Sequence, residues 1–218
     1  MLVQIAGVKN LEDAIYCEKV GVDFIGLLVG QTHESSDFIS PEKAKDITKN
    51  LKKSKSVIIT HLEEAEEIIK LAKKIGCYAI QLHSNINEIE VEKIVKSLPK
   101  IKLLRLIHIS IDGKFVTDYT KFKYVDWYFI DTFNPETNQA GGTGLKPDWN
   151  TCKQVIKDLE KPVFIAGGLN VDNLEQAIKI FNPSGVDVNS GTKNFKTGNR
   201  DKIKVKNFTK IAKNSKVV

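Results

Sequence analysis

The sequence predicts a single closed (β/α)8 barrel formed by residues 1–218. Short runs rich in β-branched residues alternate with amphipathic stretches along the whole chain, a pattern that indicates a parallel sheet covered by helices. We count eight such strand-then-helix units, with no linker or change of composition between them. The chain of 218 residues also has a length at which (β/α)8 barrels of about 200 to 250 residues form one unit.

The first half of the chain contains four of the predicted units. Each strand is a short apolar run, and each helix is a stretch in which apolar residues recur every three or four positions. Gly21 and Gly76 precede two of the strands, where glycine suits the end of a helix and the turn into the next strand. The predicted pairs are 3–5 with 11–20, 23–29 with 41–51, 56–60 with 62–75, and 78–82 with 87–98.

The second half continues the same alternation, and Pro183 to Gly185 mark the turn into its last strand. A doubly wound open sheet is the alternative fold. No GxGxxG motif follows the first strand, which disfavours that alternative. The predicted pairs are 102–109 with a short polar segment around Tyr119, 127–131 with 149–158, 162–167 with 172–181, and 185–191 with 200–213.

Composition favours a soluble protein and disfavours a membrane protein. Hydrophobic residues make up 41% of the chain, yet no stretch approaches the roughly 18 consecutive apolar residues of a membrane span. The first residues lack a secretory signal, so we expect a cytoplasmic protein that does not bind a membrane. The net charge of +6 comes from scattered lysines, because only Arg105 and Arg200 are arginines, and this distribution disfavours a nucleic-acid partner. The sequence does not predict an oligomeric state.

The three cysteines indicate neither disulfides nor a metal cluster. Cys17, Cys77 and Cys152 are odd in number and far apart in the sequence, so we expect reduced thiols. All three lie away from the predicted strand ends, which favours a role in packing or at the surface over a role as nucleophile.

In a barrel of this kind, functional residues lie on the loops that follow the strands. Two of these loops, AGGLN after the seventh predicted strand and VNSGT after the eighth, are rich in glycine and small polar residues. Barrels frequently bind phosphate with the loops after these two strands. We therefore predict a phosphate site formed by the amide groups of Gly167, Gly168 and Gly191, together with Ser190. The alternative is that both loops are ordinary tight turns.

Asp131 ends the sixth predicted strand, where its carboxyl is expected to be buried. A carboxyl whose pKa is raised by burial can act as a general acid near neutral pH. The segment after it, up to Gly144, is long and rich in glycine, and long loops in compact domains tend to be functional or disordered. We therefore prefer a catalytic role for Asp131 over a helix-capping role.

All four histidines, His33, His61, His83 and His108, fall at or just beyond predicted strand ends. Each is a possible proton carrier near pH 7, and each is equally well explained as a structural residue. No pair of them has the spacing of metal ligands, so neither a metal nor a redox cofactor is expected.

Six segments together resemble the phosphoribosylanthranilate isomerase family over essentially the whole chain. They are LEDA at 11–14, GVDFIGL at 21–27, QLH at 81–83, GGTG with DW at 141–149, AGGLN at 166–170 and GVDVNSG at 185–191. The resemblance implies an Amadori rearrangement of an aminoaldose phosphate to an aminoketose. Asp131 would be the general acid that protonates the ring oxygen, and the two glycine-rich loops would bind the phosphate.

The chain departs from the family pattern at two positions. The family usually has Lys-Ile-Cys-Gly in the first strand, with cysteine as the base that moves the proton from C2 of the sugar; this chain has Gln4-Ile5-Ala6-Gly7. The family also usually carries an arginine after the second strand for the anthranilate carboxylate, where this chain has Asp37. We expect Asp37 to repel that carboxylate.

These departures define the expected site. Asp131, His33 and His83 are the candidate catalytic residues, and Gly7, Asp37, Gly142 and Gly144 are candidates for binding the rest of a phosphosugar. The leading hypothesis is an aldose–ketose isomerase. The alternatives are a paralogue that acts as a lyase or epimerase on another phosphosugar, and a protein that binds a phosphorylated metabolite without catalysis.

Overall fold

The computed structural model of the chain describes residues 1–30, 35–137, 139–140 and 145–215, and it confirms the predicted barrel. Eight parallel strands form the ring: β1 (Leu2–Ile5), β2 (Phe24–Leu28), β3 (Lys55–Thr60), β4 (Ala79–Leu82), β5 (Lys102–Ser110), β6 (Trp127–Asn134), β8 (Val163–Ile165) and β9 (Gly185–Val188). Neighbours pair in chain order, and β5 pairs with β6 while β9 pairs with β1, so the ring is closed.

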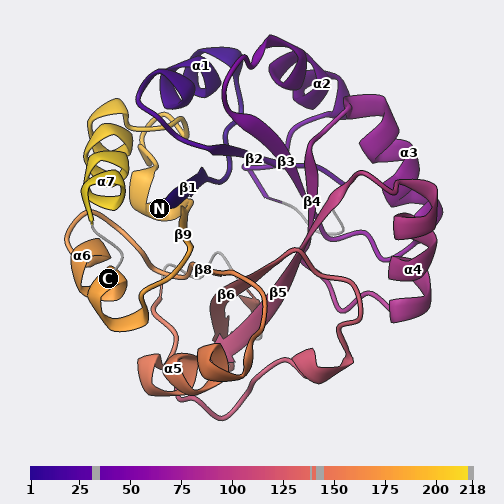
Figure 1. The fold of residues 1–218 in the computed structure, drawn as a ribbon. Helices are drawn as coiled ribbons and strands as arrows, with labels where there is room; N and C mark the ends of the chain where they lie inside the picture. The colour runs from indigo at the N-terminus through magenta and orange to yellow at the C-terminus, as the bar shows by residue number, and fades with distance from the viewer. Residues whose placement is uncertain (31–34, 138, 141–144, 216–218) are drawn as a thin grey trace.

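Seven α-helices surround the ring in the described part of the chain (Figure 1). They are α1 (Leu11–Lys19), α2 (Pro41–Asn50), α3 (Ala65–Ile75), α4 (Glu88–Ser97), α5 (Trp149–Asp158), α6 (Leu174–Phe181) and α7 (Lys202–Asn214). Local sequence sets their ends. Side chains cap five of the helix N-termini, as Ser40 does for α2, and Gly76 ends α3 in the left-handed conformation with φ of 73°.

Two segments differ from the sequence prediction, while the short segment predicted around Tyr119 is confirmed. It is a single 3-10 turn, η1 (Tyr119–Lys121), and the residues between Ser110 and this turn fold back along β5, with Thr117 N–H donating to the His108 carbonyl. Strand β6 runs to Asn134 and pairs with a short antiparallel strand, β7 (Gln139–Ala140), so part of the predicted loop is sheet. The last strand ends at Val188, and a 3-10 turn, η2 (Ser190–Thr192), follows it.

Alternation along the strands divides the barrel interior into layers. We call the seven buried side chains that fill its lower half, near the amino ends of the strands, the apolar plug. Within the plug the rings of Phe129 and Phe164 stack with centroids 4.5 Å apart. The plug consists of Phe24, Val57, Ala79, Leu104, Leu106, Phe129 and Phe164.

Polar residues lie above the apolar plug. The side-chain amide of Gln4 on β1 donates to Oε1 of Gln81 on β4 across the interior, at 2.8 Å. Both side chains are buried. This bond crosses from one side of the ring to the other and separates the apolar plug from the open end formed by the carboxyl ends of the strands.

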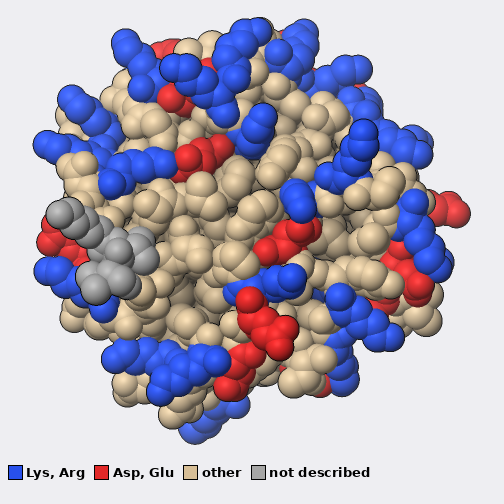
Figure 2. Space-filling model, in the orientation of Figure 1, with Lys and Arg blue, Asp and Glu red and all other residues tan. Residues whose placement is uncertain are grey.

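The outer surface carries mixed charge. On the face shown in Figure 2, lysine and arginine side chains are spread around the periphery with acidic side chains among them, and charged side chains of both signs also lie near the centre. Within the described residues, no helix is both long enough and apolar enough to cross a membrane.

Candidate functional site

The open end of the barrel collects the inward-facing residues that end the strands. Asp131 lies on β6, where the neighbouring residue Ile130 packs outward against the helices. His108 lies on β5 opposite Asp131 in the strand register. Ala6 follows β1 and is buried, close to Gly26 on the next strand. The prediction that these residues share one end of the barrel is therefore confirmed.

Asp131 has the environment that the sequence predicted for it. Its side chain is buried, and burial raises the pKa of its carboxyl to about 6, an effect that a hydrogen bond from the Thr132 N–H partly offsets. A β-carbon placed on Gly167 would lie only 3.0 Å from Oδ1 of Asp131. The first glycine of the AGGLN loop therefore lies directly beside this carboxyl.

A second buried carboxyl, Asp187 on β9, was not identified as a candidate from the sequence. Its side chain is 7% exposed and points inward, since Val186 and Val188 on either side pack outward. Burial and the nearby Asp131 raise its pKa to about 8, while Gln4 and Arg200 lower it. The signal in the sequence was an aspartate between two valines inside an apolar strand, which alternation places in the barrel interior.

The raised pKa of Asp187 predicts that Asp187→Asn stabilises the protein increasingly as the pH rises. A carboxyl with a raised folded-state pKa binds its proton more tightly in the folded chain, so it lowers stability as the pH rises from 3.8 to about 8. Asparagine does not titrate. The gain in unfolding free energy over the parent should grow by at least about 1.4 kcal/mol, the equivalent of one pKa unit, between pH 4 and pH 8.5.

Urea unfolding at the two pH values measures this gain. The matched control is Asp46→Asn on α2, where the carboxylate lies in an exposed pair with Lys49. For Asp46→Asn, the unfolding free energy relative to the parent should show no comparable increase between the two pH values. A gain for Asp187→Asn that does not change with pH would contradict the assigned environment.

The two predicted phosphate loops contact each other. Gly167 and Gly168 both adopt left-handed conformations, with φ of 79° and 61°, and lie at the end of β8. A β-carbon on Gly191 in η2 would clash with the carbonyl oxygen of Leu169, so the loop after β9 packs against the loop after β8. The two loops therefore form one continuous surface next to Asp131.

The backbone amides of this surface are available to a ligand. Among the described residues, the N–H groups of Gly167, Gly168, Ser190 and Gly191 donate to no protein acceptor, and all four residues are partly exposed. In general, amide groups without protein acceptors on neighbouring loops can bind a phosphate or another oxyanion without a side-chain cation.

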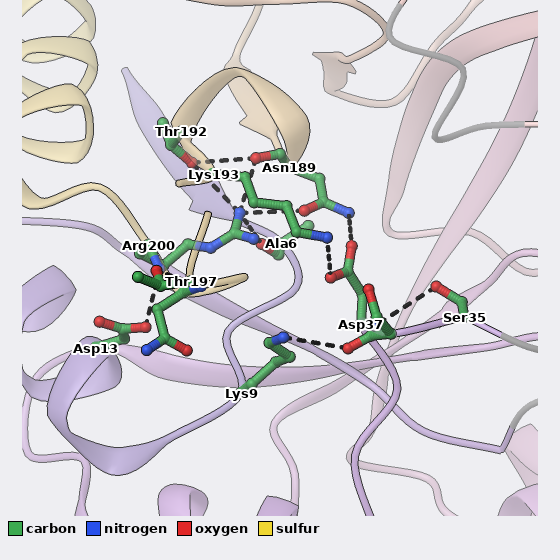
Figure 3. A network of polar contacts seen from close by, with 12 residues as sticks. Ala6, Lys9, Asp13, Ser35, Asp37, Asn189, Thr192, Lys193, Thr197 and Arg200 are labelled. Carbon is green, nitrogen blue, oxygen red and sulfur yellow. Dashed lines mark hydrogen bonds and ion pairs between the residues drawn. The ribbon is translucent and has the colours of Figure 1, made fainter. Parts of the chain in front are cut away.

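Asp37 belongs to a polar network that links the loops after β2 and β9 (Figure 3). Its Oδ1 accepts from Nζ of Lys193 at 2.5 Å, and its Oδ2 accepts from the side-chain amide of Asn189 at 3.1 Å. Both charged side chains are largely buried, at 11% exposure for Asp37 and 14% for Lys193. The negative charge that the sequence analysis assigned to this position is therefore compensated by a lysine that lies 156 residues later in the chain.

Arg200 holds the other side of the same network. Its Nη1 donates to the carbonyl oxygens of Ala6 and Asn189, at 3.1 and 2.7 Å (Figure 3). Its backbone N–H donates to Asp13 on α1 at 3.0 Å. The side chain is 4% exposed. Arg200 therefore fixes the end of β1 against the loop after β9, a role that sequence reasoning missed.

The remaining site predictions have different outcomes. Gly7 lies at the open end with φ of 66°, and a β-carbon there would meet Oδ1 of Asn189 at 2.6 Å. Gly7 therefore allows Asn189 to approach the end of β1. His33, Gly142 and Gly144 lie outside the described residues, so their predicted roles remain untested.

Three histidines form a row along the open end, beside Phe38. The His61 and His83 rings are 4.7 Å apart, and the His83 and His108 rings are 5.7 Å apart. Burial and the nearby His61 lower the pKa of His108 to about 4, so His108 is neutral at pH 7. The strand-end positions of these residues were predicted, but their contact with one another was not.

The cysteines do not reach the open end. Cys17 in α1 and Cys152 in α5 are fully buried, and Cys77 precedes β4. Burial raises the pKa of all three thiols to about 12. Thiols with such pKa values are poor nucleophiles and bases at neutral pH, in agreement with the structural role predicted for them.

Comparison with known proteins identifies the family. Residues 3–211 match the family model described as N-(5'-phosphoribosyl)anthranilate (PRA) isomerase. The chain belongs to the PRA isomerase family. It is 36% identical to N-(5'-phosphoribosyl)anthranilate isomerase 2 of Methanosarcina mazei over 215 residues, which cover 98% of this chain and 95% of the relative.

Solved structures of PRA isomerases have the same fold. Phosphoribosyl anthranilate isomerase from Thermotoga maritima is 29% identical, with a TM-score of 0.82 and coverage of 99% of this chain and 100% of that one. A PRA isomerase in complex with reduced 1-(o-carboxyphenylamino)-1-deoxyribulose 5-phosphate is 28% identical, with a TM-score of 0.80 and the same coverage. That structure shows that this fold binds a phosphosugar, and the resemblance inferred from the sequence motifs is confirmed.

Proposed function

We propose that the chain is an aldose–ketose isomerase of the Amadori type that acts on an N-phosphoribosyl substrate. The observation that carries this proposal is the contact between the phosphate loops and a buried carboxyl, since Gly167 lies beside Asp131. A phosphate held by the amides of Gly167, Gly168, Ser190 and Gly191 would place the attached sugar over the open end of the barrel. Asp131, with its raised pKa, would then protonate the ring oxygen.

The other inward-facing groups of the open end fit a sugar derivative. The histidine row presents imidazole rings on the side formed by β3, β4 and β5, while Asp37 and Lys193 present a charged pair on the side formed by β2 and β9. His83, and His33 outside the described residues, remain candidates for proton transfer in this proposal. Gly142 and Gly144 remain candidates for contact with the substrate.

The phosphate site can be tested with Gly191→Ala. The added methyl group would clash with the Leu169 carbonyl and displace the amides of η2, so we expect an affinity for inorganic phosphate lower by about 10- to 100-fold, equivalent to one lost hydrogen bond to a charged group. Thermal shift against phosphate concentration measures this change.

The matched control is Gly76→Ala at the end of α3. Gly76 also has a positive φ, but a β-carbon there meets no atom within 4 Å. This control should lose a little stability and keep its phosphate affinity. Equal phosphate affinity in Gly191→Ala and the parent would contradict the proposed site. Turnover of phosphoribosylanthranilate by the parent, followed by fluorescence, tests the activity itself.

One observation supports a second candidate function. Ala6 occupies the position at which the family motif has its basic cysteine, and alanine accepts no proton. A protein that binds a phosphorylated metabolite without turnover fits this observation. Phosphate-dependent stabilisation, combined with no turnover of phosphoribosylanthranilate, would favour this second function.

A further inference from the structure

The proposed isomerisation needs a base, and Ala6 cannot provide one. The question is which ionisable group lies nearest to the end of β1. The neighbours of β1 in the ring are β2 and β9. Inward-facing positions on β2 are Phe24, Gly26 and Leu28, none of which ionises. On β9 the inward-facing positions within the strand are Gly185 and Asp187, and of these only Asp187 ionises.

Asp187 lies directly beside β1. Its Cα partner in the strand register is Gln4, two residues before Ala6, and the Ala6 N–H donates to the carbonyl of Val188 at 3.0 Å. Because Gln4, Ala6 and Asp187 all face the interior, the Asp187 carboxyl lies next to the corner that the family's cysteine occupies. Its Oδ1 is buried and has no hydrogen-bond partner within the described part of the chain.

Asp187 and Asp131 act on each other across a small side chain. They lie on β9 and β6, the two strands that flank β8, and the inward-facing residue at the end of β8 is the small Ala166. Charge on Asp131 is one of the causes that raise the pKa of Asp187. Between about pH 6 and pH 8 the coupled pair therefore holds one proton, and Asp187 acts as a base in the form of the pair in which that proton lies on Asp131.

We infer that Asp187 is the catalytic base of this chain and replaces the cysteine that the family carries at position 6. This inference rests on the proposed function. Asp131 remains the acid, and the phosphate loops fix the sugar between the two carboxyls.

The proton transfers balance without a co-reactant. Asp131 gives its proton to the ring oxygen, the bond between that oxygen and C1 breaks, and the nitrogen lone pair forms a C1=N bond. Asp187 then takes the proton from C2; the C–H electron pair becomes a C1=C2 bond, and the C1=N pair returns to nitrogen. The enol hydroxyl gives its proton to Asp131 while Asp187 returns its proton to C1. The product is a ketone at C2, and both carboxyls regain their initial states.

The position of His83 makes it a weaker candidate for this step. It follows β4, and three strand pairings separate β4 from β1 in the ring. Its ring lies between those of His61 and His108, on the side of the open end away from Ala6. A base that replaces the cysteine must reach the same hydrogen on C2, and Asp187 starts from the adjacent strand.

A rescue experiment tests the inference. Four proteins are compared in turnover of phosphoribosylanthranilate: the parent, Asp187→Asn, His83→Gln, and Asp187→Asn combined with Ala6→Cys. We expect Asp187→Asn to lower kcat by about 10²- to 10⁴-fold, the usual contribution of a general base. Ala6→Cys should restore part of that loss, and the acid limb of the pH profile should move up toward the pKa of a free thiol, about 8.5. His83→Gln should retain more turnover than Asp187→Asn.

The outcomes separate this inference from the proposed function. No turnover by the parent, despite phosphate binding, overturns the proposed function and the base with it. Turnover by the parent that survives Asp187→Asn overturns the inference alone. An equal loss with and without Ala6→Cys also overturns it, because Asp187 would then only position another group. Unchanged thermal shift by phosphate in all variants shows that the barrel and its phosphate loops remain intact.

Discussion

Asp131→Asn is expected to lower kcat for phosphoribosylanthranilate by about 10²- to 10⁴-fold, because asparagine cannot protonate the ring oxygen of the sugar. The amide has the same shape as the carboxyl, so the barrel should fold and bind phosphate like the parent. Burial already disfavours the charged form of Asp131, and removal of that charge should leave stability at pH 8 equal or higher. Steady-state kinetics over pH 5 to 9 and thermal shift with phosphate measure both effects.

The control for this variant is Asp46→Asn, which changes an exposed aspartate on α2. It should leave kcat and its pH dependence unchanged. If Asp131→Asn retained the turnover of the parent, the acid would have to be another group and the proposed mechanism would be wrong. A loss of turnover accompanied by loss of phosphate binding would indicate disruption of the loop at Gly167 instead of loss of an acid.

Arg200→Met is expected to destabilise the protein by about 3 to 5 kcal/mol, the usual cost of removing one partner from a buried polar and charged network. The guanidinium supplies hydrogen bonds to the Ala6 and Asn189 carbonyls, and the methionine would leave these buried acceptors without a donor. In a chain of this size, each kcal/mol corresponds to about 2 to 4 °C in Tm. Differential scanning calorimetry and urea unfolding measure the loss.

Two further variants serve as controls for the loss of stability expected in Arg200→Met. Arg200→Lys keeps the charge but loses the planar fork that reaches two carbonyls, so its stability should lie between those of the parent and Arg200→Met. Lys206→Met replaces an exposed cation on α7 and should change stability by less than about 0.5 kcal/mol. Equal stability of Arg200→Met and the parent would contradict the structural role of the network.

The fold could be predicted because its signals are local and repeated. The apolar pattern of each strand-and-helix unit can be recognised within about 25 residues of sequence. Eight consecutive units of this kind predict a parallel ring. The short segment around Tyr119 in place of a helix was also predicted from the sequence. The backbone pairing of Phe115 and Thr117 with Ser110 and His108 was not, because local sequence patterns do not connect these residues.

Part of the candidate site could be predicted because its signals are also local in the sequence. Gly167, Gly168 and Asp131 stand at strand ends, and the barrel rule brings strand ends together without further information. The barrel rule does not predict contacts between side chains from distant segments of the chain. The pairing of Asp37 with Lys193 and the anchoring of Ala6 by Arg200 join residues that lie more than 150 positions apart, and no spacing in the sequence connects them.

Asp187 was missed for a different reason. Functional residues were expected on the loops and at the ends of the strands, whereas Asp187 lies inside the predicted strand 185–191. The structure shows that polar chemistry extends one layer below the loops, to the level of Gln4 on β1. The sequence signal for Asp187 is therefore an ionisable side chain at a strand position that alternation turns toward the interior.

The bond between Gln4 and Gln81 also has a consequence for how such a protein can change over time. Beneath it, tightly packed aromatic and aliphatic side chains maintain the architecture; above it lie the groups that we propose to meet a ligand. Replacements at the upper level that leave the Arg200 network intact, such as alanine at position 6, therefore carry less risk to folding than replacements in the apolar plug. Because the apolar plug and the residues above it are separate, one proton-transfer group can replace another during evolution while the fold of the barrel stays the same.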